Sequence, residues 1–249
     1  MLEGQHRRRV NTKVAVALLL TFAAGCVDII GYVALYHAFT AHMTGETVHL
    51  AQDVLAVHWL DAAKAASVIA AFLAGSIVGR VVIEIGSRTH TRRIASAALL
   101  IEAGLIAGVI PLASGHTLSE KAALGLLAML AAAMGMQTAT LTRIGSLTVH
   151  TTFVTGMLNK LAQLLSQAMF LTYDRAQGRD IALQRKGILH RAQFMVFIWL
   201  LYFIGAGTGV WMDSIWGIRS LVLPAGVVVL GIVMDQTAPL SLEEERDEA

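Results

Sequence analysis

Long hydrophobic stretches separated by short polar connections dominate the chain. An α-helix needs about 20 apolar residues to cross a bilayer, and six stretches come close to that length or exceed it. They cover residues 13–37, 62–85, 93–113, 121–141, 191–211 and 217–235. We therefore expect an all-α fold, a polytopic membrane helix bundle with six transmembrane helices.

Two further segments, 44–58 and 152–173, mix apolar residues with charged and amide side chains. The first is too short to cross a bilayer as a helix, and both are more polar than a membrane-spanning helix normally is. Each is introduced by a Thr-Gly pair, Thr44-Gly45 in the first and Thr155-Gly156 in the second. We interpret them as two re-entrant or broken half-helices.

These two segments belong to a longer internal similarity between the halves of the chain. Three features recur in the same order: a glycine before the Thr-Gly segment, the Thr-Gly pair with a Leu-Ala-Gln at fixed spacing, and a glycine pair four residues apart. They are Gly25, Thr44-Gly45, 50–52, Gly75 and Gly79 in one half, and Gly135, Thr155-Gly156, 161–163, Gly205 and Gly209 in the other. Such duplications are frequent in transporters, so we expect one transmembrane domain, 13–236, made of repeats 13–113 and 121–236.

The distribution of basic residues indicates how these repeats are oriented. Cytoplasmic loops of membrane proteins are enriched in lysine and arginine. If both Thr-Gly segments return to the side they entered from, one face carries Arg7, Arg8, Arg9, Arg88, Arg92, Arg93, Arg143, Arg175, Arg179, Arg185, Lys186 and Arg191, and the other only Lys64, Lys121 and Arg219. Full crossing would blur this bias. We therefore expect inverted repeats, with a basic N-terminus (1–12) and an acidic tail (237–249) both cytoplasmic.

Composition excludes several other classes of protein. The 249 residues are 56% hydrophobic and only 14% charged, whereas soluble domains carry about a quarter charged residues. The lone Cys26 rules out an internal disulfide, and the histidines form no zinc pattern. No catalytic motif is present, so we expect no enzyme, cofactor or metal. The basic run 175–191 is interpreted as a cytoplasmic loop rather than a nucleic-acid site.

Two motifs resemble the signatures of a known family. Val27-Asp28 with 41–48 (AHMTGETV) looks like its first motif, and 135–137 (GMQ), Arg143, Gly145 and 151–156 (TTFVTG) look like its second. The chain is similar over nearly its whole length to the YoaK family of bacterial six-span membrane proteins, a domain of unknown function. The resemblance implies a multi-pass protein of the bacterial inner membrane. Relatives usually carry asparagine where this chain has Glu46.

The Thr-Gly pairs supply the framework of a candidate site. We expect each threonine to cap the first free N–H groups of its half-helix and each glycine to allow a sharp bend. Two half-helices that meet near the midplane direct their positive ends at one place, a common design for a substrate site. We therefore assign Thr44, Gly45, Thr155 and Gly156 to substrate binding. Packing of two merely kinked helices is the alternative.

Ionisable residues within the hydrophobic segments add candidate contacts. A charge at the centre of a membrane helix costs about 2.5–3.5 kcal/mol on insertion scales, so such residues tend to be functional, paired or protonated. Asp28, Glu46 and Lys160 are the candidate charged contacts, and Lys160 is a candidate partner of Glu46 or Asp28. Glu102 is the proton-carrier candidate. A structural ion pair remains the alternative for these groups.

The sequence thus favours a transporter or channel for a small solute, and coupling to protons is one form that such transport takes. The alternative is a non-transporting membrane protein that binds a partner or a lipid. The expected partners are the lipid bilayer and an unidentified small solute, not nucleic acid, and a homo-oligomer stays open.

Overall fold

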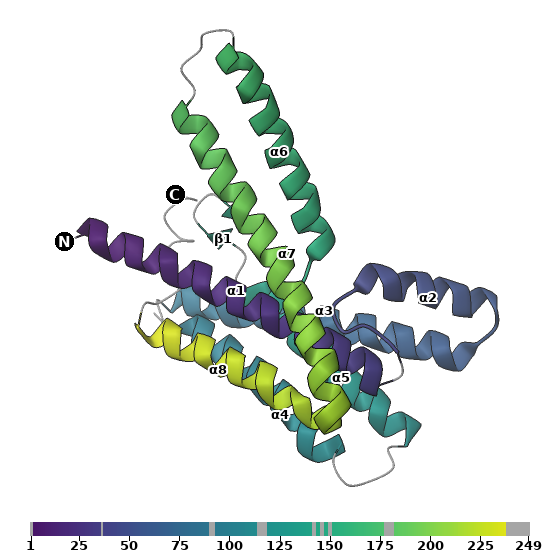
Figure 1. Ribbon diagram of the computed structural model, residues 1–249. Helices are drawn as coiled ribbons and strands as arrows, with labels where there is room; N and C mark the ends of the chain where they lie inside the picture. The colour runs from purple at the N-terminus through teal and green to yellow at the C-terminus, as the bar shows by residue number, and fades with distance from the viewer. Residues whose placement is uncertain are drawn as a thin grey trace.

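The chain is helical almost throughout (Figure 1). The structure, a computed structural model, describes residues 2–35, 37–89, 93–113, 119–140, 143–144, 147–148, 151–176 and 182–237. Its elements are α1 (Leu2–Ala34), α2 (Met43–Leu55), α3 (Trp59–Arg88), α4 (Ile94–Ala113), α5 (Glu120–Thr140), β1 (Arg143–Ile144), β2 (Leu147–Thr148), α6 (Val154–Ala176), α7 (Ala182–Trp216), the 3-10 helix η1 (Gly217–Leu221) and α8 (Val222–Thr237). The two short strands form an antiparallel pair.

Five helical stretches are long and apolar enough to cross a membrane: Asn11–Ala34, Trp59–Arg88, Ile94–Ala113, Glu120–Thr140 and Gln184–Thr237. The last, 54 residues long, is one continuous stretch that contains α7 from Gln184 onward, η1 and α8. Two expected segments therefore fall within a single stretch, in which the chain changes direction between α7 and α8 (Figure 1). The expected all-helical, membrane-type fold is confirmed at this level.

The two Thr-Gly segments form shorter partners of long helices. α2 packs along α3, and α6 packs along α7. In Figure 1 these pairs are two arms that extend from the remaining helices. Helix α6 buries Met157, Leu164 and Ala168, which lie on one face at helical spacing. Much of the rest of its surface is exposed, because α7 is the one described helix that packs along its length.

Glycines bring α1 close to α7 and α5 close to α3. A Cβ atom on Gly25 would lie 2.3 Å from the carbonyl oxygen of Tyr202, and one on Gly135 would lie 2.1 Å from that of Phe72. These residues correspond, since Tyr202 and Phe72 each precede a packing glycine, Gly205 or Gly75, by three positions. Side chains would hold these backbones apart, so the glycines that recur in the sequence are the ones that set the two crossings.

Contacts also define the relative directions of corresponding helices. The Gln137 side chain reaches the Leu20 carbonyl oxygen, while a Cβ on Gly31 would lie 3.5 Å from Leu130, so α1 and α5 are antiparallel. In α4 and α8, the carboxylate of Asp235 accepts a hydrogen bond of 3.0 Å from the Ser96 N–H. Leu99 lies opposite Gly231, so this pair is antiparallel as well.

Candidate functional site

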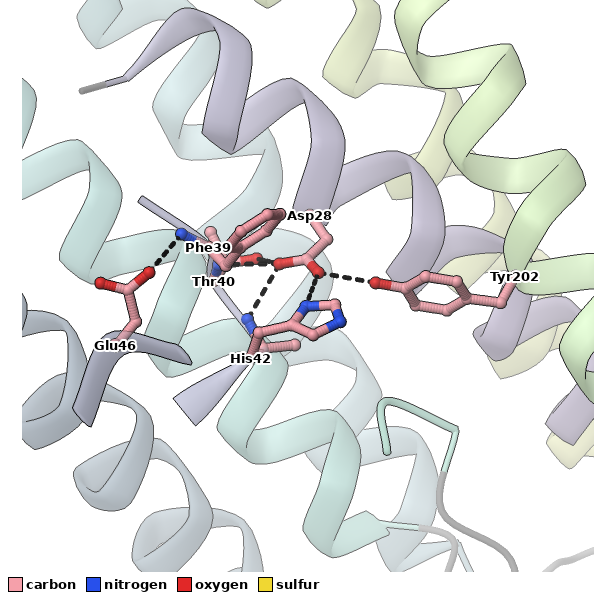
Figure 2. A network of polar contacts seen from close by, with 7 residues as sticks. Asp28, Phe39, Thr40, His42, Glu46 and Tyr202 are labelled. Atoms are coloured by element: carbon pink, nitrogen blue, oxygen red, sulfur yellow. Dashed lines mark hydrogen bonds and ion pairs between the residues drawn. The ribbon is translucent and has the colours of Figure 1, made fainter. Parts of the chain in front are cut away.

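Asp28 is the centre of a buried hydrogen-bond network (Figure 2). Its Oδ1 atom accepts bonds from the N–H and the hydroxyl of Thr40, at 2.8 and 2.9 Å, and from the N–H of Ala41 at 2.9 Å. Its Oδ2 atom lies 2.5 Å from His42 Nδ1 and accepts a bond of 2.6 Å from the Tyr202 hydroxyl. Every partner except the His42 ring nitrogen is a donor by chemistry, and that ring donates when Nδ1 carries a proton. The arrangement therefore fits an ionised carboxylate.

The network brings the chain back into the bundle after the end of α1. Asp28 lies six residues before Ala34, about 9 Å along the axis at 1.5 Å per residue. Because Asp28 binds the backbone of Thr40 and Ala41, the segment after α1 returns to this depth before α2 begins. The exposed backbone donors of a loop need partners when water is excluded. Asp28 supplies two of those bonds.

Glu46 satisfies a third donor of the same loop. Its side chain on the first turns of α2 is buried, and Oε1 accepts a bond of 2.8 Å from the Phe39 N–H. Asp28 and Glu46 thus hold three consecutive backbone N–H groups, those of Phe39, Thr40 and Ala41. The loop that precedes α2 is anchored by carboxylates from α1 and α2 (Figure 2).

Aromatic rings surround this loop. Tyr32 and Phe39 stack with ring centroids 4.5 Å apart, and Phe39 lies 4.9 Å from the His42 ring. The Tyr202 ring from α7 meets His42 edge-on at 6.2 Å. The side chain of His42 keeps 39% of its surface accessible, whereas Asp28 keeps 3%. His42 is therefore much more accessible to a ligand than the carboxylate that it contacts.

Charges at the loop are coupled through His42. The hydrogen bond to Asp28 raises the pKa of His42 above its ordinary value, although partial burial acts in the opposite direction. Burial raises the pKa of Glu46, which the bond from Phe39 and the nearby His49 partly offset. The contact with Asp28 thus favours the protonated form of His42, and burial favours the neutral form of Glu46.

The second half contains a similar tie made only by neutral groups. Thr138 follows Gly135 at the distance at which Asp28 follows Gly25, and its hydroxyl lies 2.6 Å from that of Thr152. Gln137 Nε2 donates to the Thr151 hydroxyl at 2.9 Å. The segment before α6 is therefore attached to α5 as the segment before α2 is attached to α1.

The second half has apolar residues at the positions that match His42, Glu46 and Tyr202 of the network. His42 precedes Gly45 by three residues, and Phe153 precedes Gly156 by three; Glu46 and Met157 directly follow the two glycines. In place of the Tyr202 hydroxyl, the equivalent α3 position carries Phe72, which has none. A neutral tie holds the second loop, so attachment alone does not require the charged groups of the first.

The expected framework residues occupy different positions from those predicted. The N-cap of α2 is His42, without a side-chain cap bond, and Thr44 is the second residue of the helix. Thr155 is likewise the second residue of α6. Both threonines are exposed and, among the described residues, form no side-chain hydrogen bond. Capping by these threonines is therefore wrong, because both lie inside their helices; in the loop before α2, the N–H groups of residues 39–41 are bound by Asp28 and Glu46.

The glycines and Lys160 also differ from expectation. Gly45 has no atom within 4 Å of an added Cβ, whereas one on Gly156 would lie 2.3 Å from the Phe153 ring. Neither glycine has a positive φ, since Gly217 is the only described glycine that does. Lys160 is exposed on α6. Asp28 contacts His42 and Glu46 accepts a bond from the Phe39 N–H, so Lys160 is not the partner of Asp28.

Glu102 is the most isolated of the candidate residues. It is fully buried on α4, and neither carboxyl oxygen has a hydrogen-bond partner among the described residues. It lies outside the Asp28 network. Groups of three or more histidine, cysteine or acidic side chains suited to a metal ion are absent from the described part of the chain.

Comparison with known proteins supplies the family. A family model described as "Protein of unknown function (DUF1275)" matches residues 16–234. The chain belongs to this family. It is also 26% identical over 228 residues to the UPF0700 transmembrane protein YoaK of Bacillus subtilis (strain 168), which covers 92% of this chain and 95% of the relative. No solved structure matches. The expected resemblance to YoaK is confirmed.

Sequence reasoning missed two residues of the site in this DUF1275 protein. His42 stands in the first family-like motif beside Thr44-Gly45, but the search for zinc spacing set it aside. Tyr202 lies in an apolar run of α7 with no local signal. Its position three residues before the recurring Gly205 marks a close helix contact, yet only the fold shows that the contact is with α1 near Asp28.

Proposed function

We propose that this protein transports a small polar solute across the bacterial inner membrane, with the solute site at the Asp28 network. The observation that carries the proposal is one buried carboxylate, within a candidate membrane span, that accepts five contacts from the loop before α2 and from α7. Ionisable residues inside membrane helices are costly and are typically retained for substrate or ion pathways. In this proposal the protein moves the solute across the membrane and does not convert it chemically.

The proposed architecture is six spans in two inverted repeats, with cytoplasmic termini. Helix α1 is antiparallel to α5, and α4 is antiparallel to α8. If α2 and α6 crossed fully, each half would hold four spans and the corresponding helices would run parallel. The antiparallel directions instead support an odd number of crossings in each half. Three crossings per half leave α2 and α6 as re-entrant helices. Substrate sites of such transporters lie at the interface of the repeats, where helices are broken.

The network suits a site that changes during a transport cycle. The Tyr202 hydroxyl of α7 is bonded to Asp28 of α1, which joins the second half to the first. A solute that meets the accessible face of His42 changes the charge balance of the His42–Asp28 pair and so the strength of the Tyr202 contact. We expect α7 to move relative to α1 on binding, because a ligand shifts a conformational equilibrium through contacts that differ between the two states.

Binding of a lipid or a protein partner is the second candidate function. It is favoured by α6, which exposes Met169, Phe170 and Tyr173 beside polar side chains such as Gln163 and Lys160. Exposed apolar area of this kind is expected at lipid or protein contacts. The second candidate predicts that ligand binding depends on the α6 surface and not on Asp28.

Thermal unfolding of the purified protein, recorded by tryptophan fluorescence with a panel of inorganic ions, small carboxylic acids and amines, tests the proposal. We expect at least one compound to raise the unfolding temperature of the wild type and of Thr138→Val, but not of Asp28→Asn or His42→Gln. Uptake of that compound into proteoliposomes follows as the direct measurement. Equal stabilisation of all four proteins, or a complete absence of stabilisation, counts against a solute site at Asp28.

A further inference from the structure

A carboxyl group without partners lies inside the helix bundle, apart from the Asp28 network. Glu102 stands mid-way along α4 and is fully buried. Its two oxygens are the only carboxyl pair in the described residues for which both atoms are buried and without a hydrogen-bond partner. The neighbouring buried positions of α4 are apolar: Leu99, Ala103 and Ile106.

The charged groups on the helices around α4 do not neutralise Glu102. Those on the described elements that pack against it are Asp61, Lys64, Arg80, Glu84 and Arg88 of α3, Glu120 and Lys121 of α5, Arg219 of η1 and Asp235 of α8. None of them lies within hydrogen-bond distance of the Glu102 carboxyl group. Asp235 accepts bonds from Ser96 instead, and Lys64 pairs with Glu120. A buried charge with neither a counter-ion nor a donor is strongly disfavoured, and the group takes a proton instead.

We propose that Glu102 is a proton-binding site. Its carboxyl group is neutral in the conformation of this structure and loses its proton only when water reaches α4. The proton site stands on the burial and isolation of the carboxyl group, and only its use in a cycle rests on the proposed transport function. In that cycle, separation of α4 from its neighbours would hydrate the carboxyl group and release the proton to water. Return to the closed arrangement would require a proton to be taken up again.

Infrared spectroscopy of the protein in lipid vesicles tests the proton site directly. A protonated carboxyl group has a C=O stretching band that an ionised carboxylate lacks. We expect a Glu102-dependent component of this band in the wild type at pH 7, which is lost in Glu102→Gln and persists in Glu84→Gln. The Glu84 side chain is about half-exposed and paired with Arg88, so it serves as an ionised control. Asp28→Asn should also keep the band, because Asp28 is held as a carboxylate.

Reaction with dicyclohexylcarbodiimide gives an independent measurement on the same proteins. The reagent adds to a protonated carboxyl group: it takes the acid proton, bonds to the oxygen and leaves an adduct heavier by one reagent molecule. We expect an adduct at Glu102 in the wild type, and one adduct fewer in Glu102→Gln, by intact mass spectrometry. Absence of the Glu102-dependent infrared band at pH 7 overturns the proposal whatever the mass result. The band together with no solute response retains the proton site and rejects only solute transport.

Discussion

Replacing Asp28 by alanine tests whether the buried network determines the stability of this fold. The substitution removes the acceptor of five contacts, including the pair with His42. Loss of one partner of a buried ion pair costs about 3–5 kcal/mol. Each buried donor left without a partner costs about 1–3 kcal/mol more. Because the loop is able to relax toward water, we expect a total loss of about 4–6 kcal/mol.

Thr138→Val is the matched control from the second half. It removes the contact between the hydroxyls of Thr138 and Thr152 and the bond from Thr138 to the Met134 carbonyl oxygen within α5, both between neutral groups. The expected cost is about 1 kcal/mol. Free energies of unfolding are obtained from tryptophan fluorescence of the four native tryptophans during titration of mixed micelles with sodium dodecyl sulfate. If Asp28→Ala costs no more than Thr138→Val, the network is not what anchors the loop before α2.

Three further predictions concern glycines, pH and topology. Gly75→Ala should destabilise the protein by about 3 kcal/mol or more, because the added Cβ would lie 2.0 Å from a backbone oxygen. Gly45→Ala should stabilise it by up to about 1 kcal/mol, because no atom lies within 4 Å of the added Cβ. The free energies of unfolding of the two variants test both expectations. The raised pKa of His42 means that its pair with Asp28 stabilises fully below pH 6.5 and loses this effect as pH rises through the raised value. The unfolding temperature of the wild type relative to His42→Gln should therefore fall from pH 6 to pH 9, and a constant difference would refute the pair. Finally, in a background without the native cysteine, Ser119→Cys should react with an impermeant maleimide added to intact cells and Arg93→Cys should not; the reverse pattern contradicts the orientation.

The predictions from the sequence agree most closely with the structure for features that local composition determines. The hydrophobic segments form helices because a long apolar run has no stable conformation in lipid except one that satisfies its own backbone. The polar segments were separated from them correctly, as α2 (Met43–Leu55) and α6 (Val154–Ala176), within a few residues of the expected limits. The recurring glycines were also visible, since close helix contact requires small residues at fixed spacing.

Contacts between distant segments could not be predicted in this way. The sequence indicated that Asp28 and Glu46 matter, because a charge in an apolar setting is costly. It offered no reason to choose His42 over Lys160 as the partner of Asp28. That choice depends on the path of the loop after α1, which folds back by about 9 Å and places His42 beside the carboxylate.

The sequence alone determined that this chain forms long apolar helices of the membrane type and where its closely packed glycines recur, because hydropathy and glycine spacing are local properties. Only the tertiary structure decided that α7 of the second half supplies Tyr202 to the carboxylate of the first, at a helix crossing set by Gly25 and Gly205. It also decided that Glu102 is enclosed without a partner. Both facts depend on which helices become neighbours, and this follows from the packing of the whole bundle rather than from any single segment.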